Sequence, residues 1–176
     1  MKILLLDSPT DPRLEMALIA DSARRPDRRP LFVPESGSWI CELRLCVRIS
    51  RLGKCIAEAF APRYYDAVSA VCLLRPTDRS RDVRYMIMDD TMVQGDWTDL
   101  PAGDSIMALA VNGEPHPMSL PRGYIDRAVH ELSADMTFKT GDMLILPEVM
   151  AAYDAEPGNT CTVTLNDKPI LDFNIK

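Results

Sequence analysis

The chain has 176 residues, of which 47% are hydrophobic and 26% charged, and its formal net charge is −6. This composition is that of one soluble globular domain, residues 1–176, with a core large enough to fold alone. The negative balance argues against a general nucleic-acid surface, and no apolar run approaches the roughly 20 residues of a membrane span. The sequence therefore predicts no nucleic-acid partner and no membrane partner.

The five cysteines are odd in number and have no CxxC spacing. Most of them lie in apolar runs, where a free thiol behaves as a small hydrophobic side chain. This usage fits a reducing compartment better than a disulfide framework. The first apolar run, Ile3–Leu6, is too short for a signal-peptide core and is ended by Asp7. The sequence predicts a cytoplasmic protein.

Three short strands are predicted before the central one. Apolar runs predict strands at Lys2–Leu6 and Met16–Ile19, with the polar segment Ser8–Glu15 between them. A loop is expected at Asp21–Pro30 and a further short strand at Leu31–Pro34. The predicted loop carries the basic residues Arg24, Arg25, Arg28 and Arg29. We expect these arginines to form a solvated loop, with an anion or partner site as the alternative.

The central stretch of the sequence, residues 41–49, alternates with a period of two. Its apolar positions are Cys41, Leu43, Leu45, Val47 and Ile49, and the residues between them are Glu42, Arg44, Cys46 and Arg48. This period predicts a strand with one buried face. A turn follows, and Lys54–Phe60 is predicted to form a short helix that ends before Pro62.

The middle of the chain predicts two more strands and a helix. Ala67–Leu74 is a continuous apolar run of strand length, which Arg75-Pro76 stops. A strand is expected at Ile106–Val111, and Asn112-Gly113 after it is the strongest hairpin signal in the chain. Tyr124–Leu132 has apolar residues at helical spacing.

The C-terminal part is predicted to close the fold with strands. Met143–Leu146 is a short apolar run, and Thr160–Leu165 and Ile170–Ile175 flank an Asn166-Asp167 turn. Two short helices and many short strands are predicted, so the predicted fold class is β-rich α+β. We see no internal repeat and no domain boundary.

Several segments resemble the fumarylacetoacetate hydrolase superfamily. The segment RISRLGKCIAEAFAPRYYD, residues 48–66, is similar to the segment that follows the first metal ligands in that family. Residues 29–34 resemble the family's Arg-Pro-aromatic-aromatic-x-Pro run, and the tail from Thr140-Gly141-Asp142 resembles its last segment. Asp89 and Gly95 match two positions of its Asp-Gly-Ser-x-Pro-x-Gly segment. The resemblance implies a rolled, mixed β-sheet core, β-clip-like, with few short helices.

The resemblance also implies where a divalent metal, usually magnesium, would bind. Members of the family hold the ion with a Glu-x-Glu pair on one strand and an aspartate on a later strand. Residues i and i+2 of a strand share a face, and carboxylate oxygens are the ligands that magnesium prefers. The ion polarises a 2-oxo acid substrate. In this chain the three positions correspond to Glu42, Arg44 and Leu73.

Only Glu42 of these three positions is a metal ligand. A guanidinium about 4 Å from a divalent cation is repelled by roughly 8 kcal/mol at an effective dielectric constant of 20. We therefore expect Glu42 and Arg44 to form a salt bridge on one face of the strand, with Arg44 in the place of the ion.

Other functional positions of the family are also replaced. Its lysine corresponds to Met86, and its Thr-Gly-Thr-Pro turn corresponds to Leu146–Val149. The histidine and glutamate of the family's lid have no counterpart, because Ser8–Glu15 is short and contains no histidine. The sequence predicts no catalytic residue and no cofactor-binding residue.

No alternative site stands out. His116 and His130 lie outside any metal or triad spacing, and His130 is expected to be solvated on the predicted helix. The chain has no GxSxG elbow, P-loop or GxGxxG motif. An acidic cluster is formed in the sequence by Asp89, Asp90, Asp96 and Asp99. It could attract a cation, but an exposed loop is the favoured interpretation.

Two functional hypotheses follow. The first is a non-catalytic member of the superfamily, without a cofactor, that has a structural, regulatory or small-acid-binding role. The alternative is a Mg- or Mn-dependent hydrolase, decarboxylase, hydratase or isomerase that acts on a 2-oxo acid of the acylpyruvate kind, with a rebuilt site. We also predict a homodimer, with an active paralogue as the alternative partner. Ala67–Leu74 and the methionine cluster of Tyr85–Met92 supply more apolar side chains than one small domain need bury.

Overall fold

The computed structural model describes residues 1–176 except 14, 27, 36, 79–82 and 104. Its strands in chain order are β1 (Ile3–Leu6), β2 (Met16–Ile19), β3 (Arg24–Pro26), β4 (Trp39–Ile49), β5 (Tyr65–Pro76), β6 (Met92–Gln94), β7 (Thr98–Asp99), β8 (Ile106–Met107), β9 (Leu109–Val111), β10 (Glu114–Pro115), β11 (Met118–Ser119), β12 (Met143–Asp154), β13 (Thr160–Leu165) and β14 (Lys168–Asn174). Its helices are α1 (Arg122–Asp135) and the 3₁₀ helices η1 (Asp21–Ala23), η2 (Glu58–Arg63) and η3 (Arg84–Met86).

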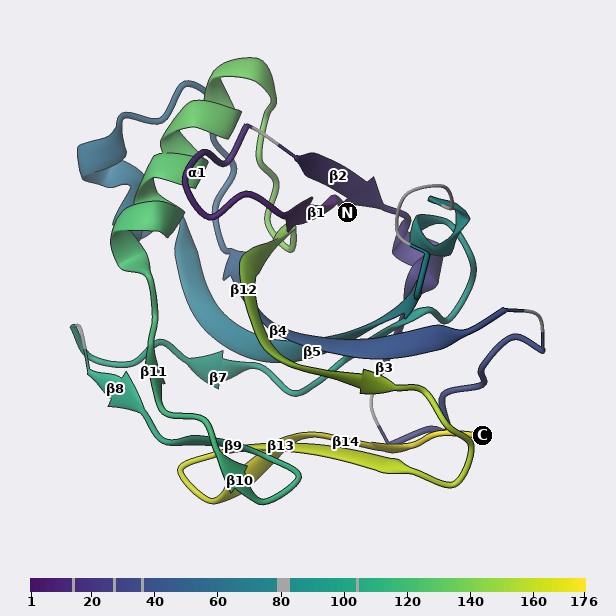
Figure 1. Ribbon diagram of the computed structural model, residues 1–176. Helices are drawn as coiled ribbons and strands as arrows, with labels where there is room; N and C mark the ends of the chain where they lie inside the picture. Colours follow the sequence, from purple (N-terminus) through teal and green to yellow (C-terminus); the bar gives the residue numbers. More distant parts are fainter. Residues whose placement is uncertain (14, 27, 36, 79–82, 104) are drawn as a thin grey trace.

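One large mixed sheet dominates the molecule. Its strand order is β2-β1-β12-β4-β5-β6-β3, and β7 also pairs with β5. β1 runs parallel to β12, and β3 runs parallel to β6, whereas the other pairs are antiparallel. The sheet curls into a half-barrel, so that β1 and β2 lie across its concave side from β4 and β5 (Figure 1).

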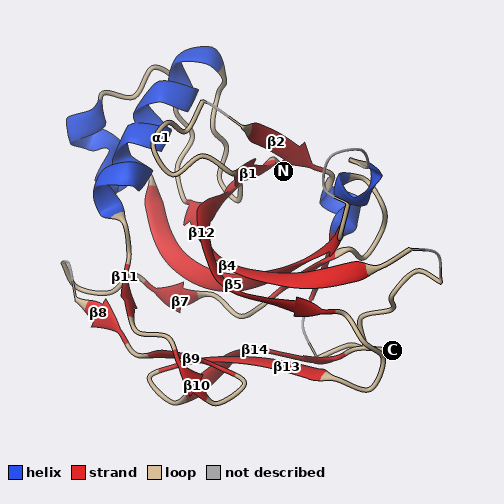
Figure 2. Cartoon of the chain, in the orientation of Figure 1, coloured by secondary structure: helices blue, strands red, loops and turns tan. Residues whose placement is uncertain are grey.

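A four-stranded sheet, a two-stranded sheet of β8 and β11, and the helix α1 accompany the large sheet. The four-stranded small sheet has the order β10-β9-β13-β14 and lies below the convex face of β4 and β5, while α1 lies at one end beside η2 (Figure 2). The predicted β-rich α+β class is confirmed. The helix predicted at Tyr124–Leu132 and the strands predicted at Met16–Ile19 and Thr160–Leu165 are confirmed as well.

Strand β4 is buried on both faces, which corrects the prediction of one buried face. The alternation itself is confirmed, and the odd positions from Cys41 to Ile49 pack in the main core, between the large sheet and the elements on its convex side. Glu42, Arg44 and Cys46 on the opposite face are also buried. The reason is the curl of the sheet, because the concave face of β4 is covered by side chains from β1, β5 and β12. The alternating pattern of one strand does not show whether other strands of a curled sheet cover its second face.

The helix predicted at Lys54–Phe60 is wrong. The backbone amides of Cys55 and Ile56 bond to Ser133 at the end of α1, and Cys55 has a left-handed φ of 52°. Because these amides bond to Ser133 in α1, residues 54–57 do not form a helix. The 3₁₀ helix η2 forms later, at Glu58–Arg63, and includes Pro62.

Four other boundaries differ from the predictions. Leu31 forms only an isolated bridge with Ile175 instead of a strand, and the predicted loop Asp21–Pro30 contains η1 and β3. The predicted strand Ile106–Val111 is divided into β8 and β9. The strand predicted at Met143–Leu146 continues to Asp154, with register shifts between Ile145 and Ala151. Bulges of this kind let one strand change direction and follow the curl.

The apolar patch on which the homodimer was predicted is largely internal. Every side chain from Ala67 to Leu74 is buried, because β5 lies in the middle of the curled sheet. In the segment Tyr85–Met92, Tyr85 and Met92 are buried, and Ile87 is the exposed large apolar residue. The dimer itself stays a prediction, but it needs another surface.

Gly95 has a packing role in this fold. A Cβ atom added there would lie 2.0 Å from the carbonyl oxygen of Ile170 in β14, and the amide of Asp96 donates to that same oxygen at 2.6 Å. The glycine therefore permits a close backbone contact between the end of β6 and the small sheet. This contact, and not chemistry, explains why a residue without a side chain stands at this position.

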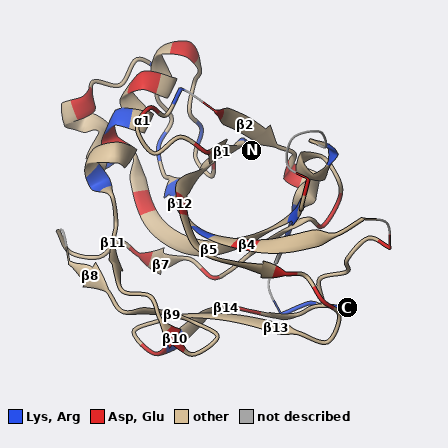
Figure 3. Cartoon of the chain, in the orientation of Figure 1, with Lys and Arg blue, Asp and Glu red and all other residues tan. Residues whose placement is uncertain are grey.

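Charges of both signs are interspersed along the chain, including on α1 (Figure 3). None of the helices in the described part of the chain has the length and hydrophobicity that a membrane crossing requires.

Candidate functional site

The concave face of the large sheet carries a group of buried charged side chains. Glu42 and Arg44 lie on this face of β4 because they are two residues apart. In the register of β4 with β5, Glu42 pairs with Leu73, and Arg75 lies two residues further on. Arg75 therefore shares the face of Glu42, and Glu42 lies between two arginines.

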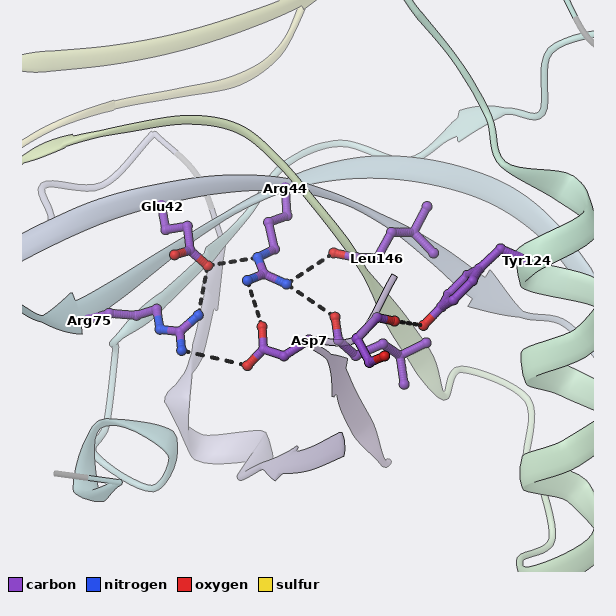
Figure 4. Close-up of polar contacts among 8 residues, drawn as sticks. Asp7, Glu42, Arg44, Arg75, Tyr124 and Leu146 are labelled. Atoms are coloured by element: carbon purple, nitrogen blue, oxygen red, sulfur yellow. Dashed lines mark hydrogen bonds and ion pairs between the residues drawn. The ribbon is translucent and has the colours of Figure 1, made fainter. Parts of the chain in front are cut away.

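Asp7, which follows β1, closes these three residues into a ring that we call the quartet: Asp7, Glu42, Arg44 and Arg75. Glu42 Oε1 accepts hydrogen bonds from Arg44 Nε at 2.7 Å and from Arg75 Nη1 at 2.8 Å. Arg44 Nη2 donates to Asp7 Oδ1 at 2.6 Å, and Arg75 Nη2 lies 3.6 Å from Asp7 Oδ2 (Figure 4). Two carboxylates and two guanidiniums make the quartet formally neutral.

Arg44 is the most fully bonded member of the quartet. In addition to its two carboxylate contacts, its Nη1 donates to the carbonyl oxygens of Leu6 at 3.1 Å and Leu146 at 3.3 Å. These carbonyls belong to β1 and β12, so one guanidinium joins three strands of the sheet. The predicted Glu42–Arg44 salt bridge is therefore present, and it is buried, with side-chain exposures of 0% and 3%.

These residues do not fit the divalent ion that the family resemblance implies. Glu42 Oε1 is already shared by two guanidiniums, and Leu73, at the position of the expected aspartate, packs in an apolar cluster with Met92. A cation at Glu42 would meet two positive charges at hydrogen-bond distance from its ligand. In the described part of the chain, no three His, Cys, Asp or Glu side chains are arranged to hold a metal ion.

Asp7 is the member of the quartet nearest to solvent. Its side chain is 24% exposed, whereas that of Glu42 is fully buried. The loop that follows it is held against α1, because Tyr124 donates its hydroxyl to the Ser8 carbonyl at 2.7 Å and Arg127 donates to the Thr10 carbonyl. Helix α1 thus fixes the segment that delivers Asp7 to the arginines.

Two buried donors, one within the quartet and one in a neighbouring side chain, have no hydrogen-bond partner among the described residues. They are Arg75 Nε and the Tyr85 hydroxyl, in residues that are 7% and 5% exposed. The Arg75 guanidinium lies over the Tyr85 ring, 5.4 Å from its centroid. Burial raises the pKa of Tyr85, so its phenol keeps the proton and stays a donor.

The charge of Arg75 is secured by its neighbours. Burial lowers the pKa of this guanidinium, but the Glu42 and Asp7 carboxylates and the Tyr85 side chain outweigh that effect and raise it. Arg75 therefore stays cationic at every pH at which the protein folds.

The other predicted family positions supply packing and backbone contacts. Met86 is partly buried and packs against both apolar clusters. Leu146–Val149 begins the bulged part of β12, and its contribution to the quartet is the Leu146 carbonyl. The loop Ser8–Glu15 supplies backbone contacts to α1.

The histidines and the acidic cluster lie outside the quartet. His130 Nδ1 lies 2.7 Å from the Ile56 carbonyl at the surface of α1, and His116 is half-buried in the loop before β11. In the acidic cluster, Asp89, Asp90 and Asp99 are exposed, and Asp96 pairs with Arg28 at 3.0 Å.

The basic segment is not simply a solvated loop. Arg24 and Arg25 belong to β3, where Arg24 bonds to Gln94 at 3.0 Å and Arg25 is 7% exposed. The prediction of a solvated loop is therefore wrong for Arg25. The reason is the parallel pairing of β3 with β6, which draws this segment into the sheet.

Sequence reasoning missed Asp7, Arg75 and Tyr85. Arg75 lies two residues after Leu73 and therefore shares its face of β5, but the predicted strand ended at Leu74, one residue before Arg75. No local pattern pointed to Asp7, since its partners are 37 or more residues away in the chain.

No protein-family model matches the chain, and no curated protein matches it. Solved structures do match. The 5-carboxymethyl-2-hydroxymuconate delta-isomerase from Mycobacterium smegmatis matches with a TM-score of 0.80 and 23% identity, covering 99% of this chain and 76% of that one. The 2-hydroxyhepta-2,4-diene-1,7-dioate isomerase from Mycobacterium marinum matches with a TM-score of 0.79 and 19% identity, covering 99% and 73%. Maleylpyruvate hydrolase from Sphingobium sp. SYK-6 matches with a TM-score of 0.77 and 17% identity, covering 99% and 69%.

These likenesses extend over nearly the whole of this chain. At less than 25% identity they show a shared fold, and the predicted fumarylacetoacetate hydrolase-like fold is confirmed. Fold alone does not carry an activity from one protein to another.

Proposed function

We propose that this chain is a divergent, non-catalytic member of the fumarylacetoacetate hydrolase superfamily. The observation that supports the proposal is that Glu42 Oε1 is bonded to two guanidiniums, those of Arg44 and Arg75. The chemistry that the family resemblance implies needs a divalent ion at this glutamate. Here the carboxylate is neutralised by the chain's own cations.

The energetics favour the arginines over a metal ion. A divalent cation and a guanidinium about 4 Å apart repel each other by roughly 8 kcal/mol at an effective dielectric constant of 20. Arg44 cannot withdraw without breaking its bonds to Asp7 and to two backbone carbonyls. Leu73 offers no oxygen ligand in compensation.

The test is a thermal melt of metal-free protein with MgCl₂ or MnCl₂ added to 5 mM (a concentration about 100-fold above a Kd of 50 μM). A bound ion at that concentration would stabilise the native state by about 2.7 kcal/mol, which raises the melting temperature by roughly 5–10 °C. We expect no rise. Sphingobium maleylpyruvate hydrolase, whose structure contains manganese(II) and pyruvate, is the positive control. A saturable rise in this protein, abolished in Glu42→Ala, would overturn the proposal.

The alternative function is a metal-dependent hydrolase or isomerase that acts on a 2-oxo acid. It is favoured by one observation, which is that the named structural neighbours are isomerases and a hydrolase. The assay is the loss of acylpyruvate absorbance at micromolar protein with manganese present. On the non-catalytic proposal the rate equals that of the buffer, and a rate that Glu42→Ala removes would establish the alternative.

A further inference from the structure

We propose that Arg44 and Arg75 form a binding site for a small monocarboxylate, and that the chain's own Asp7 occupies this site in the structure. The inference rests on the proposed function, because the two arginines can hold a carboxylate only where no metal ion takes Glu42. Its steps concern the charge, the geometry and the tether of Asp7.

The first step is charge. Glu42 neutralises one of the two buried guanidiniums, and Asp7 neutralises the other. Without the Asp7 carboxylate, the three remaining side chains would have a net charge of +1 in a site where Arg44 is 3% and Arg75 8% exposed. A buried, unbalanced cation strongly favours an anion beside it.

The second step is geometry. The two oxygens of Asp7 face different arginines, Oδ1 facing Arg44 at 2.6 Å and Oδ2 facing Arg75 at 3.6 Å. Only the first distance is that of a hydrogen bond, so the Arg75 side of the site is incompletely filled. Arg75 Nε and the Tyr85 hydroxyl, both buried, have no acceptor among the described residues. The site therefore holds at least one donor, Arg75 Nε, that Asp7 does not satisfy.

The third step is the tether. Asp7 is the half-buried member of the quartet, and it is held there by β1 on one side and by the loop that Tyr124 fastens to α1 on the other. A tethered carboxylate acts at a high effective concentration, so an external one does not displace it readily. The contacts between the loop and α1 therefore determine how firmly the site is closed.

The experiment removes the tethered group and offers a free one. Asp7→Ala leaves a space the size of one carboxylate group, so formate should fit best, acetate less well and propionate least. Melting temperatures are measured in EDTA, with sodium chloride replaced by sodium formate at constant ionic strength and pH. We expect Asp7→Ala to melt below the wild type, and formate to raise its melting temperature saturably, by roughly 5–10 °C at 100 times Kd.

Two variants make the result specific. Asp66→Ala also removes a carboxylate from an arginine, Arg48, but that pair is exposed and contains one guanidinium. It should gain nothing from formate. Asp7→Ala/Arg75→Ala lacks half of the proposed site and should lose the response.

Each outcome decides the proposal. A saturable rise confined to Asp7→Ala, in the order formate, acetate, propionate, supports it. No rise, or an equal rise in the wild type and Asp66→Ala, overturns it. If Asp7→Ala does not fold in chloride, its refolding from urea in formate is measured instead, and failure to fold in formate as well overturns it. A response that appears only when manganese replaces EDTA would overturn the proposed function.

Discussion

Replacing Arg44 tests how much the quartet stabilises the fold. Arg44→Ala removes four hydrogen bonds, to Glu42, Asp7 and the carbonyls of Leu6 and Leu146. Removing one partner of a buried ion pair costs about 3–5 kcal/mol, because the remaining charge is left uncompensated. That is a large part of the roughly 5–15 kcal/mol by which a domain is stable. The melting temperature should fall by roughly 8–15 °C.

Arg48→Ala is the matched control for that measurement. Arg48 lies on the same strand and the same face, and it bonds to Asp66 through two contacts of 2.9 Å, but the pair is 37% and 44% exposed. Exposed pairs contribute about 0–1 kcal/mol. Urea unfolding followed by circular dichroism gives both free energies. Equal losses in the two variants, or a loss below about 1 kcal/mol for Arg44→Ala, would refute the assignment of a buried, cooperative quartet.

Three further predictions concern other parts of the molecule. Burial raises the pKa of Asp142, but hydrogen bonds from Lys2 and from two backbone amides outweigh it, so the folded pKa lies below the ordinary 3.8. In urea unfolding, the wild type should therefore be more stable than Asp142→Asn above about pH 5. This difference should disappear as the pH falls through the folded pKa. Gly95→Ala should destabilise the fold by more than about 2 kcal/mol in the same assay, because the new Cβ would lie 2.0 Å from a carbonyl oxygen. Gly123→Ala, the control, has open space around its Cβ in α1 and should stabilise the fold by up to about 1 kcal/mol. We also propose that two copies pair through the exposed edge strand β2, where Leu18 is 59% exposed. Light scattering should give twice the chain mass for the wild type and the single chain mass for Leu18→Lys. A monomeric wild type would contradict the proposal.

Local sequence patterns predicted the elements whose conformation depends on neighbouring residues, such as the hairpin turns. The Asn166-Asp167 turn is an example, since both residues adopt the left-handed φ that a two-residue hairpin turn requires, at 50° and 61°. The same holds for Asn112-Gly113 between β9 and β10. Apolar runs also located β1 and β2, although β1 is buried throughout whereas β2 is an edge strand in which Ile19 is the buried residue.

The curl of the large sheet could not be predicted from any of these patterns. It depends on which strands pair, and β1 lies beside β12, about 140 residues later in the chain. The curl decides that Cys46, between two arginines in the sequence, is fully buried. In a strand that is covered on both faces, the polar residues of an alternating pattern can form a buried polar site instead of a solvated face.

The candidate site was predictable to the extent that it lies on one strand. The spacing of Glu42 and Arg44 predicted their salt bridge correctly, and the same argument extended to β5 would have included Arg75. Asp7 joins the site through tertiary structure alone. The prediction that Arg44 occupies the place of a metal ion stays untested, and the metal titration decides it.

Stability alone does not explain a buried ring of four charges. Apolar side chains of similar volume are often equally or more stabilising than a buried ion pair, because the ions lose their hydration. Arg75 Nε within the quartet and the neighbouring Tyr85 hydroxyl are buried without acceptors among the described residues, and each such donor costs about 1–3 kcal/mol. The proposed exchange of Asp7 for a free carboxylate would give the Arg75 donor an acceptor and would account for the partial exposure of Asp7. The formate experiment and the Arg44 measurement separate these roles, because a purely structural quartet would show the loss of stability without the response to formate.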